Sequence, residues 1–271
     1  MGVGRPLAVG GGAAGLVIAL LVYLLGGDPG DVLSTDTRSP TRQVGTGGSG
    51  GTADPAQARA ADFVSVILAD TEDTWPKLLE PKGVRYVQPH LVMFSDAAES
   101  ACGVQESAVG PFYCPLDQRV YLDLGFFNEL DQRFGAPGDF ARAYVVAHEV
   151  GHHVQNLLGI SERVQGMRAR SRSEANALSV LQELQADCFA GIWAHHAQKQ
   201  RQVLEKGDIE QGLQAAAAIG DDTLQRKAQG RVVPESFTHG SSAQRVQWFT
   251  RGFEQGTLEA CDTFGAASRG R

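Results

Sequence analysis

Two histidines four residues apart, His148 and His152, limit the folds open to this chain more than any other part of its sequence. Aromatic residues and valines recur around them at helical spacing, so the segment is predicted to be a helix. Residues four apart share one helical face, which lets both imidazoles reach one tetrahedral metal ion. Glu149 is offset from that face and can reach a water molecule at the metal, the position of a general base.

A third ligand must come from elsewhere, because catalytic zinc usually takes three protein ligands and keeps the fourth position open. Glu183 is the preferred candidate. It lies in a long predicted helix, and Asp187 follows one turn later on the same face, where it could accept a hydrogen bond from a ligand histidine. The residues alone leave four rivals for the third ligand: Asp187, Glu174, His195 and His196.

Two further histidines lie near predicted helices. His153 is about 100° round the helix from His152, so we predict a packing or surface role for it. His239 lies in a turn before the last predicted helix, from which a side chain can point into a cleft. It could donate a hydrogen bond to the oxyanion that forms when water attacks a carbonyl. In the alternative interpretation Ser241 or Ser242 caps the helix and His239 is incidental.

The N-terminal part contains an uncharged apolar run of 20 residues, from Leu7 to Gly26, about the length that a helix needs to cross a bilayer. Arg5 precedes it and Asp28 and Asp31 follow it, so residues 1–6 are expected in the cytoplasm and the rest of the chain outside. The run is long for a signal peptide, and no A-x-A-like cleavage site follows it. We therefore predict an uncleaved single-pass anchor in the cell membrane, with a cleaved signal peptide as the alternative.

Between residues 27 and 53 the composition changes to Gly, Ser, Thr, Asp and Pro. Such a segment buries too little apolar surface to offset the entropy of ordering it, so we predict a flexible tether. One domain is expected over residues 54–271. The formal net charge of -7 leaves no basic excess to bind phosphates, which argues against a nucleic-acid partner.

All four cysteines fall in the predicted domain, and their even number suits two disulfides in an oxidising compartment. Cys102 and Cys114 flank a short segment containing Gly and Pro and are the natural local pair, which leaves Cys188 with Cys261. The alternative, a cysteine zinc site, lacks the C-x-x-C spacing that would support it.

The domain is predicted to be α+β, with a small sheet beside a mainly helical body. A helix begins at Asp54-Pro55 and ends near Trp75-Pro76. Strands follow at 84–94 and 119–124, the second with the alternation of a half-buried strand. Further helices are predicted near 139–158, 174–200, 208–219 and 241–255.

Several segments resemble the bacterial neutral zinc metallopeptidase family. They are Ser100-Ala101-Cys102-Gly103, Gly110-Pro111-Phe112-Tyr113-Cys114-Pro115, Val120-Tyr121-Leu122-Asp123, HEVGHHVQ from His148, ELQADCFAG from Glu183, and Ser236-Phe237-Thr238-His239-Gly240-Ser241-Ser242. The likeness extends from residue 54 onward and includes the N-terminal anchor in kind. H-E-x-x-H followed by E-x-x-x-D is similar to the gluzincin arrangement, which implies Glu183 as the third zinc ligand and Asp187 as the partner of a histidine.

The resemblance implies a zincin-like fold in which the strand at 120–124 is an edge strand that binds an extended peptide. The expected activity is endopeptidase-like, Zn²⁺-dependent hydrolysis of peptide or protein substrates, with Glu149 as general base and His239 at the oxyanion. Two alternatives are a catalytically inactive, zinc-stabilised peptide-binding module of the cell envelope and a hydrolase of a non-peptide amide, such as a cell-wall bond. Glu149 argues against the first, because a structural zinc site has no use for a base.

Overall fold

The computed structural model describes residues 55–106, 110–123, 125–171 and 174–269. The predicted anchor at 7–26 and tether at 27–53 lie outside the described residues. Within the described ranges, no helix combines the length and the apolar character needed to cross a membrane. The described part is α+β, with a small sheet and a mostly helical body, as predicted.

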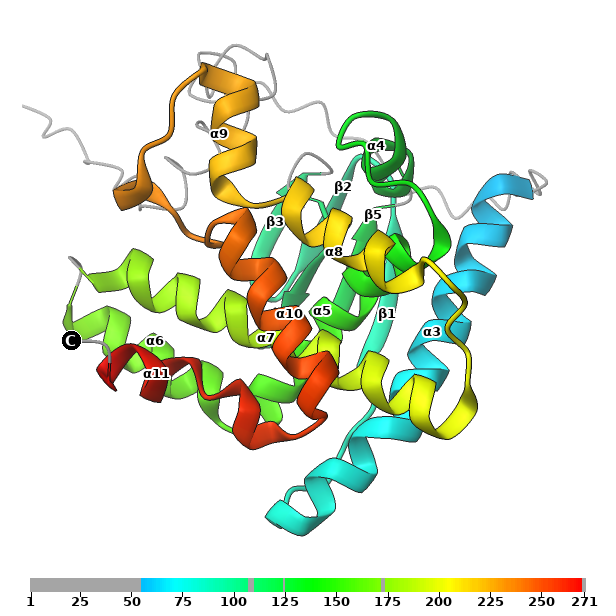
Figure 1. Ribbon diagram of the computed structural model, residues 1–271, viewed down its shortest axis with the longest axis horizontal. Helices are drawn as coiled ribbons and strands as arrows, with labels where there is room; N and C mark the ends of the chain where they lie inside the picture. Colours follow the sequence, from blue (N-terminus) through cyan, green and yellow to red (C-terminus); the bar gives the residue numbers. More distant parts are fainter. Residues whose placement is uncertain (1–54, 107–109, 124, 172–173, 270–271) are drawn as a thin grey trace, which may run out of the picture. The chain divides into compact units, whose positions relative to one another are not determined.

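The elements follow one another as a long helix, five short strands and a series of helices (Figure 1). They are α3 (Pro55–Leu79), β1 (His90–Phe94), β2 (Ala97–Ser100), β3 (Gly103–Glu106), β4 (Phe112–Cys114), β5 (Arg119–Asp123), α4 (Phe126–Gln132), α5 (Asp139–Leu157), α6 (Ile160–Arg170), α7 (Ala175–Arg201), α8 (Asp208–Ala218), α9 (Asp221–Gln229), α10 (Ser242–Gln255) and α11 (Thr263–Arg269). Short 3-10 turns lie at Glu80–Lys82, Pro234–Ser236 and Leu258–Cys261.

Helix α5 is the buried centre of the fold. Phe140 and Tyr144 pack into an apolar cluster with residues of α7, α8 and α10. Val146 and Val150, on another face of α5, pack into a second cluster with residues of α3 and with Leu122 of β5. A helix that is apolar on most sides is stable only inside a core, and α5 is accordingly enclosed.

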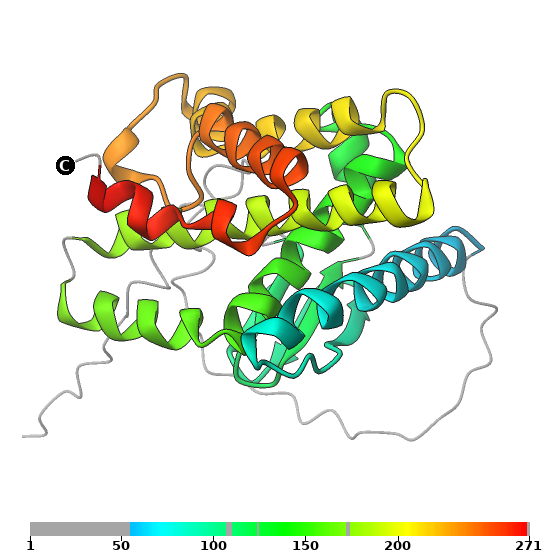
Figure 2. The same cartoon turned by 60° about the horizontal axis from the view of Figure 1, so that its bottom comes forward.

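Helix α10 crosses α7 at close range, as Figures 1 and 2 show from two directions. The crossing depends on Gly252, because a Cβ atom there would lie 1.9 Å from the carbonyl oxygen of Cys188. Any larger residue at this position would push the two helices apart. The contact holds α10 against the part of α7 that contains Asp187.

The sheet order corrects two predictions about the strand at 119–124. The order is β1-β5-β4, with β5 parallel to β1 and antiparallel to β4. Strand β5 is therefore central, and the prediction that it is an edge strand was wrong. Residues 120–123 are all buried, so the half-buried pattern was also wrong. Leu122 packs in the cluster shared with α3 and α5, while Tyr121 packs with Phe94, Ala98 and Cys114.

Two predicted boundaries also differ from the structure. The strand expected from Val84 begins only at His90, because β5 starts at Arg119, the partner of His90, and offers nothing to pair with residues further upstream. The first helix continues through Pro76 to Leu79 instead of ending at the proline. Trp75 and Leu79 are fully buried on either side of Pro76, and their packing offsets the backbone hydrogen bond that the proline lacks.

Both predicted disulfides are formed. Cys102–Cys114 joins the turn between β2 and β3 to the end of β4. Cys188–Cys261 joins α7 to the 3-10 turn that follows α10. The second bond closes a loop of 73 residues and attaches the C-terminal segment beside Asp187.

Candidate metal centre

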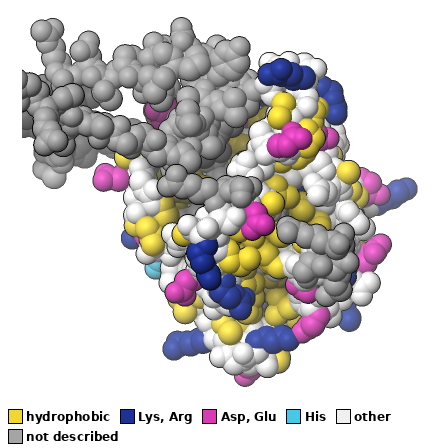
Figure 3. Space-filling model, turned by 90° about the vertical axis from the view of Figure 1, so that its left-hand side faces the viewer, with side chains coloured by type: hydrophobic (Ala, Val, Ile, Leu, Met, Phe, Trp, Pro, Cys, Tyr) yellow, Lys and Arg dark blue, Asp and Glu magenta, His cyan; other side chains and the backbone are white. Residues whose placement is uncertain are grey.

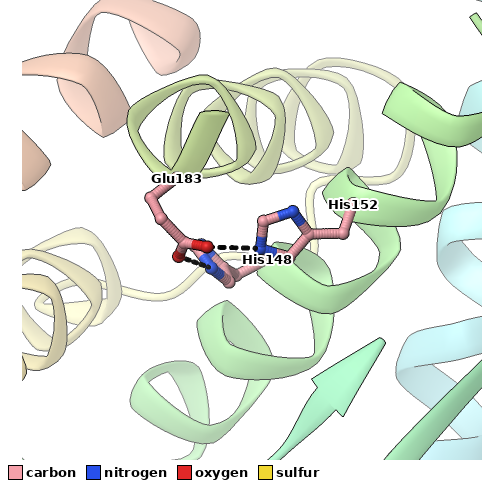
Figure 4. Close-up of side chains that lie close together, drawn as sticks. All are labelled: His148, His152 and Glu183. Atoms are coloured by element: carbon pink, nitrogen blue, oxygen red, sulfur yellow. Dashed lines mark ion pairs between the residues drawn. The ribbon is translucent and has the colours of Figure 1, made fainter. Parts of the chain in front are cut away.

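Helices α5 and α7 bring three potential metal ligands together. The side chains of His148 and His152 from α5 and of Glu183 from α7 point toward one another (Figure 4). Nε2 of His148 lies 3.3 Å from Oε2 of Glu183, and Nε2 of His152 lies 3.4 Å from Oε1. The three ligand atoms are all within 4.8 Å of one another.

These separations suit ligands that share one metal ion. Zinc in a tetrahedral site binds N and O atoms at about 2.0 to 2.1 Å, which places neighbouring ligand atoms about 3.3 to 3.4 Å apart. Direct N–H···O hydrogen bonds are shorter, at about 2.7 to 3.2 Å. Two imidazoles and one carboxylate are also the donor set of many catalytic zinc sites, in which the fourth position stays open. The residues therefore fit zinc.

Gly151, between the two histidines, allows α7 to approach α5. A Cβ atom at this position would lie 2.9 Å from the backbone oxygen of Ala186. A side chain would have to move α7 away, and Glu183 with it. The glycine thus sets the distance between the helix of the histidines and the helix of the glutamate.

A buried network holds the His148 ring. Nδ1 of His148 donates to Oδ1 of Asp187 at 2.8 Å, so its Nε2 is the nitrogen that faces Glu183. Asp187 also accepts from the Tyr144 hydroxyl at 2.5 Å and from Nε and Nη2 of Arg245, both at 2.9 Å. Burial alone would raise the pKa of Asp187, but the charges of Arg245 and His148 lower it. Asp187 is thus held as a carboxylate.

Sequence reasoning missed Tyr144 and Arg245. Tyr144 lies one helical turn before His148, so its position on the same face was a signal that could have been used. Arg245 comes from α10, and its role depends on the crossing of α10 and α7, which no local pattern reveals.

We expect Arg245→Met to lower the free energy of unfolding by about 3 to 5 kcal/mol, because it leaves the buried Asp187 carboxylate without its cation. Zinc affinity should fall as well, since Asp187 orients His148. Urea unfolding and competition with a metal chelator measure the two effects. Arg251→Met is the matched control, because Arg251 lies exposed on the same helix with its guanidinium over Trp248. Equal stability and zinc affinity of the two variants would contradict this account of Arg245.

The His152 ring is held by a chain of glutamines. Nδ1 of His152 donates to Oε1 of Gln155 at 2.9 Å, and Gln155 donates to Oε1 of Gln185 at 3.1 Å. Gln185 in turn donates to the carbonyl of Cys261 at 2.9 Å. The chain connects His152 to the segment attached by the Cys188–Cys261 bond, a link that the sequence did not indicate.

Glu149 is buried beside the two histidines, with an exposed fraction of 7%. Burial raises the pKa of its carboxyl above the ordinary value, against the charges of His148 and His152, which lower it. A general base works best when its pKa lies near the working pH. The environment of Glu149 shifts its pKa in that direction.

His239 lies on the loop before α10, with 46% of its side chain exposed. It is close enough to Glu183 for their charges to interact. Burial raises the pKa of Glu183, while His152, His148 and, to a smaller extent, His239 lower it. The accessible ring of His239 thus lies within reach of the charge of Glu183.

Asp187, one of the four rivals for the third ligand, contacts Nδ1 of His148 and is not in the cluster. The other three rivals also lie outside it. His195 and His196 are engaged by carbonyl oxygens at the end of α10, at 2.7 Å from Phe253 and 2.9 Å from Gly256. They follow Glu183 by twelve or more residues on one helix, about 18 Å along its axis. Glu174 is exposed at the start of α7. None of the three belongs to the metal-binding group found among the described residues.

His153 has the packing role expected of it. It is fully buried, and its ring lies 3.0 Å from the Tyr113 hydroxyl and 2.6 Å from the Val87 carbonyl oxygen. A carbonyl only accepts, so Nε2 carries the proton and Nδ1 accepts from Tyr113. His153 thereby fastens β4 and the segment before β1 to α5.

A cavity of about 610 Å³ lies between α6, α7, α11 and the 3-10 turn at Leu258–Cys261. Figure 3, which faces the side where α6 and α11 lie in Figure 1, shows apolar side chains gathered between basic and acidic ones. The cavity wall includes Gln185 but none of the three candidate ligands. It is a separate feature of the molecule.

The fold and site define an α+β protein in which an H-E-x-x-H helix meets a glutamate of a second helix, with a donor set that could hold a metal ion. The chain belongs to the family described as "Putative neutral zinc metallopeptidase", which it matches over residues 1–264.

Similar proteins occur in Escherichia coli and in mycobacteria. YpfJ of Escherichia coli K12 is 50% identical over 255 residues, which cover 94% of this chain and 88% of the relative. Mb2605 of Mycobacterium bovis and Rv2575 of Mycobacterium tuberculosis H37Rv are each 43% identical over 261 residues, covering 91% of this chain and 86% of the relative. All three are described as uncharacterized proteins. No solved structure matches the chain significantly.

Proposed function

We propose that the protein is a zinc-dependent peptidase that hydrolyses internal peptide bonds. The observation that carries the proposal is the convergence of His148, His152 and Glu183 around one point with Glu149 buried beside them. A purely structural zinc site fills all four positions with protein ligands and needs no base. Three ligands and an adjacent carboxylate instead suit hydrolysis, and membership of the family supports the same activity.

In this proposal each residue has one task. His148, His152 and Glu183 would hold zinc, which when bound supplies a Lewis acid that polarises the scissile carbonyl and acidifies water. Asp187 and Gln155 fix the two imidazoles with Nε2 toward Glu183. Glu149 takes the proton of the attacking water and passes it to the leaving amine.

His239 completes the proposed site as a hydrogen-bond donor to the oxyanion that develops on the scissile carbonyl. Its ring is exposed, and its charge interacts with that of Glu183, which supports this role. The loop before α10 would then help to stabilise the transition state, together with the residues of α5 and α7.

The substrate would bind in an extended form along β4. Within the described sheet β4 is an edge strand, whereas both sides of β5 are paired. Tyr113 of β4 accepts a hydrogen bond from Nδ2 of Asn156 at 3.1 Å, so β4 lies beside the turn of α5 that follows His152. An added peptide strand would receive main-chain hydrogen bonds along β4, close to the turn of α5 that follows His152.

A substrate screen tests the proposal. The full-length protein with zinc is incubated with a quenched-fluorescent peptide library and, separately, with cell-wall fragments. We expect the protein to cleave bonds within peptides and to leave the cell-wall amides intact. Cleavage of wall amides alone would mean a non-peptide amidase, and peptide binding without cleavage would mean an inactive binding module; either result overturns the proposal.

We further propose that the domain works outside the cytoplasm, attached to the membrane by residues 7–26. The length of that apolar run and the two disulfides support this location. Alkaline phosphatase fused after residue 53 should be active, because the enzyme needs export to form its own disulfides. An inactive fusion, or four free thiols in protein from its native host, would contradict the location.

A further inference from the structure

Asp221, the first residue of α9, holds the loop that carries His239. The residue is largely buried, with an exposed fraction of 8%. Its Oδ2 atom accepts three successive backbone N–H groups, from Thr238 at 2.7 Å, His239 at 2.7 Å and Gly240 at 3.0 Å. Three amides on one carboxylate oxygen fix the backbone of this loop, because charge-assisted hydrogen bonds are stronger than neutral ones.

The other oxygen of the same carboxylate faces the His239 ring. Oδ1 of Asp221 lies 3.2 Å from Nδ1 of His239, and the hydroxyl oxygen of Thr238 lies 3.1 Å from the same nitrogen. An ionised carboxylate only accepts hydrogen bonds, so Nδ1 must carry a proton. Nε2, at the opposite side of the ring, is then the nitrogen available to the site.

Desolvation lowers the pKa of the His239 ring, but the hydrogen bond to Asp221 and the charges of Glu183 and Asp221 raise it, against the charge of Arg245, and the net shift is upward. Together with the contact between Nδ1 and Asp221, this favours a ring protonated on both nitrogens. Only the doubly protonated ring donates from Nε2 while Nδ1–H is held by Asp221. An oxyanion would meet a donor that is already oriented and charged.

We propose that Asp221 is a positioning residue for catalysis: it fixes the loop and keeps the proton on Nδ1 of His239, so that Nε2 is presented to the reacting carbonyl. This inference rests on the proposed function for its catalytic consequence, but the protonation of His239 is measurable without any turnover. Asp221 itself acts only through His239.

The decisive variant is Asp221→Asn. The amide oxygen can still accept the backbone N–H groups, whereas an amide nitrogen facing His239 donates to Nδ1 and reverses the polarity of that contact. Asp222→Asn is the matched control. Asp222 is the next residue of α9, but its Oδ1 accepts from the backbone and hydroxyl of Ser242, at 2.7 and 2.8 Å.

The first readout is NMR of the full-length protein with ¹⁵N-labelled histidine, with the His239 signals identified by their loss in His239→Ala. We expect both ring nitrogens to be protonated in the wild type and in Asp222→Asn, and Nδ1 to be unprotonated in Asp221→Asn. A wild-type ring in which either nitrogen lacks its proton overturns the inference, whether or not Asp221→Asn folds and whether or not the protein is a peptidase.

The second readout is peptide cleavage. We expect Asp221→Asn to lower kcat by about 10- to 100-fold, as for other residues that orient a functional histidine, with KM little changed because the interaction forms in the transition state. In a His239→Ala background the same substitution should have almost no further effect. Additive losses would show that Asp221 is only structural. If the wild type cleaved no peptide, the proposed function would be wrong. The NMR measurement would still show whether Asp221 keeps the proton on Nδ1 of His239.

Discussion

Glu149→Gln should bind about one equivalent of zinc. Its kcat should nevertheless fall by about 10²- to 10⁴-fold, the contribution typical of a general acid–base group. The substitution removes the proton acceptor and leaves His148, His152 and Glu183 in place. The variant should also fold well. Burial raises the pKa of Glu149, so the folded protein loses stability as the pH rises and Glu149 ionises. A neutral glutamine avoids this loss of stability.

Metal analysis, urea unfolding and peptide cleavage measured on one preparation separate these effects. Glu162→Gln is the control, since Glu162 is exposed on α6. The assignment of Glu149 as the base would be refuted by unchanged turnover in Glu149→Gln. Loss of zinc together with activity would instead mean that Glu149 helps to hold the metal.

Glu183→Ala should abolish zinc binding along with activity, because it removes one of only three protein ligands. Asp187→Asn should affect zinc less, since it weakens an orienting hydrogen bond, and a loss of about 10- to 100-fold in zinc affinity or activity is expected. It should also lower the free energy of unfolding, because it leaves the buried Arg245 without its anion. Metal stoichiometry after gel filtration and cleavage at raised zinc concentration distinguish the two variants. Asp187→Asn should regain activity with added metal and Glu183→Ala should not.

The controls for Glu183 are three of its four former rivals. Glu174→Ala, His195→Ala and His196→Ala should each retain zinc, because the structure places these residues away from the cluster. If zinc survived in Glu183→Ala and was lost in one of them, the third ligand would be misassigned and the gluzincin-like interpretation would have to be given up.

Local spacing explains what the sequence predicted well. The four-residue interval of His148 and His152 determines a shared helical face in any helix, and α5 has that face. The interval between Glu183 and Asp187 acts in the same way on α7. The pairing of Cys102 with Cys114 followed from their short separation, which is itself local.

Features that depend on distant segments were not predictable from one sequence. Strand β5 was expected at an edge, because nothing in residues 119–123 reveals that β1 and β4 flank it on both sides. Arg245 and Asp221 were missed for the same reason. An arginine in the last long helix and an aspartate at the start of α9 look like surface residues until the fold places them against Asp187 and His239.

The central claim is that one zinc ion at His148, His152 and Glu183 supports peptide hydrolysis, and a zinc titration tests it most directly. The full-length protein is stripped with a chelator, dialysed, and assayed for peptide cleavage as zinc is returned in fractions of an equivalent. We predict that the stripped protein is inactive and that activity rises linearly and levels off at one zinc per chain, with Glu149→Gln binding the same amount without activity. Cleavage by the stripped protein, or activity unrelated to zinc occupancy, would contradict the claim.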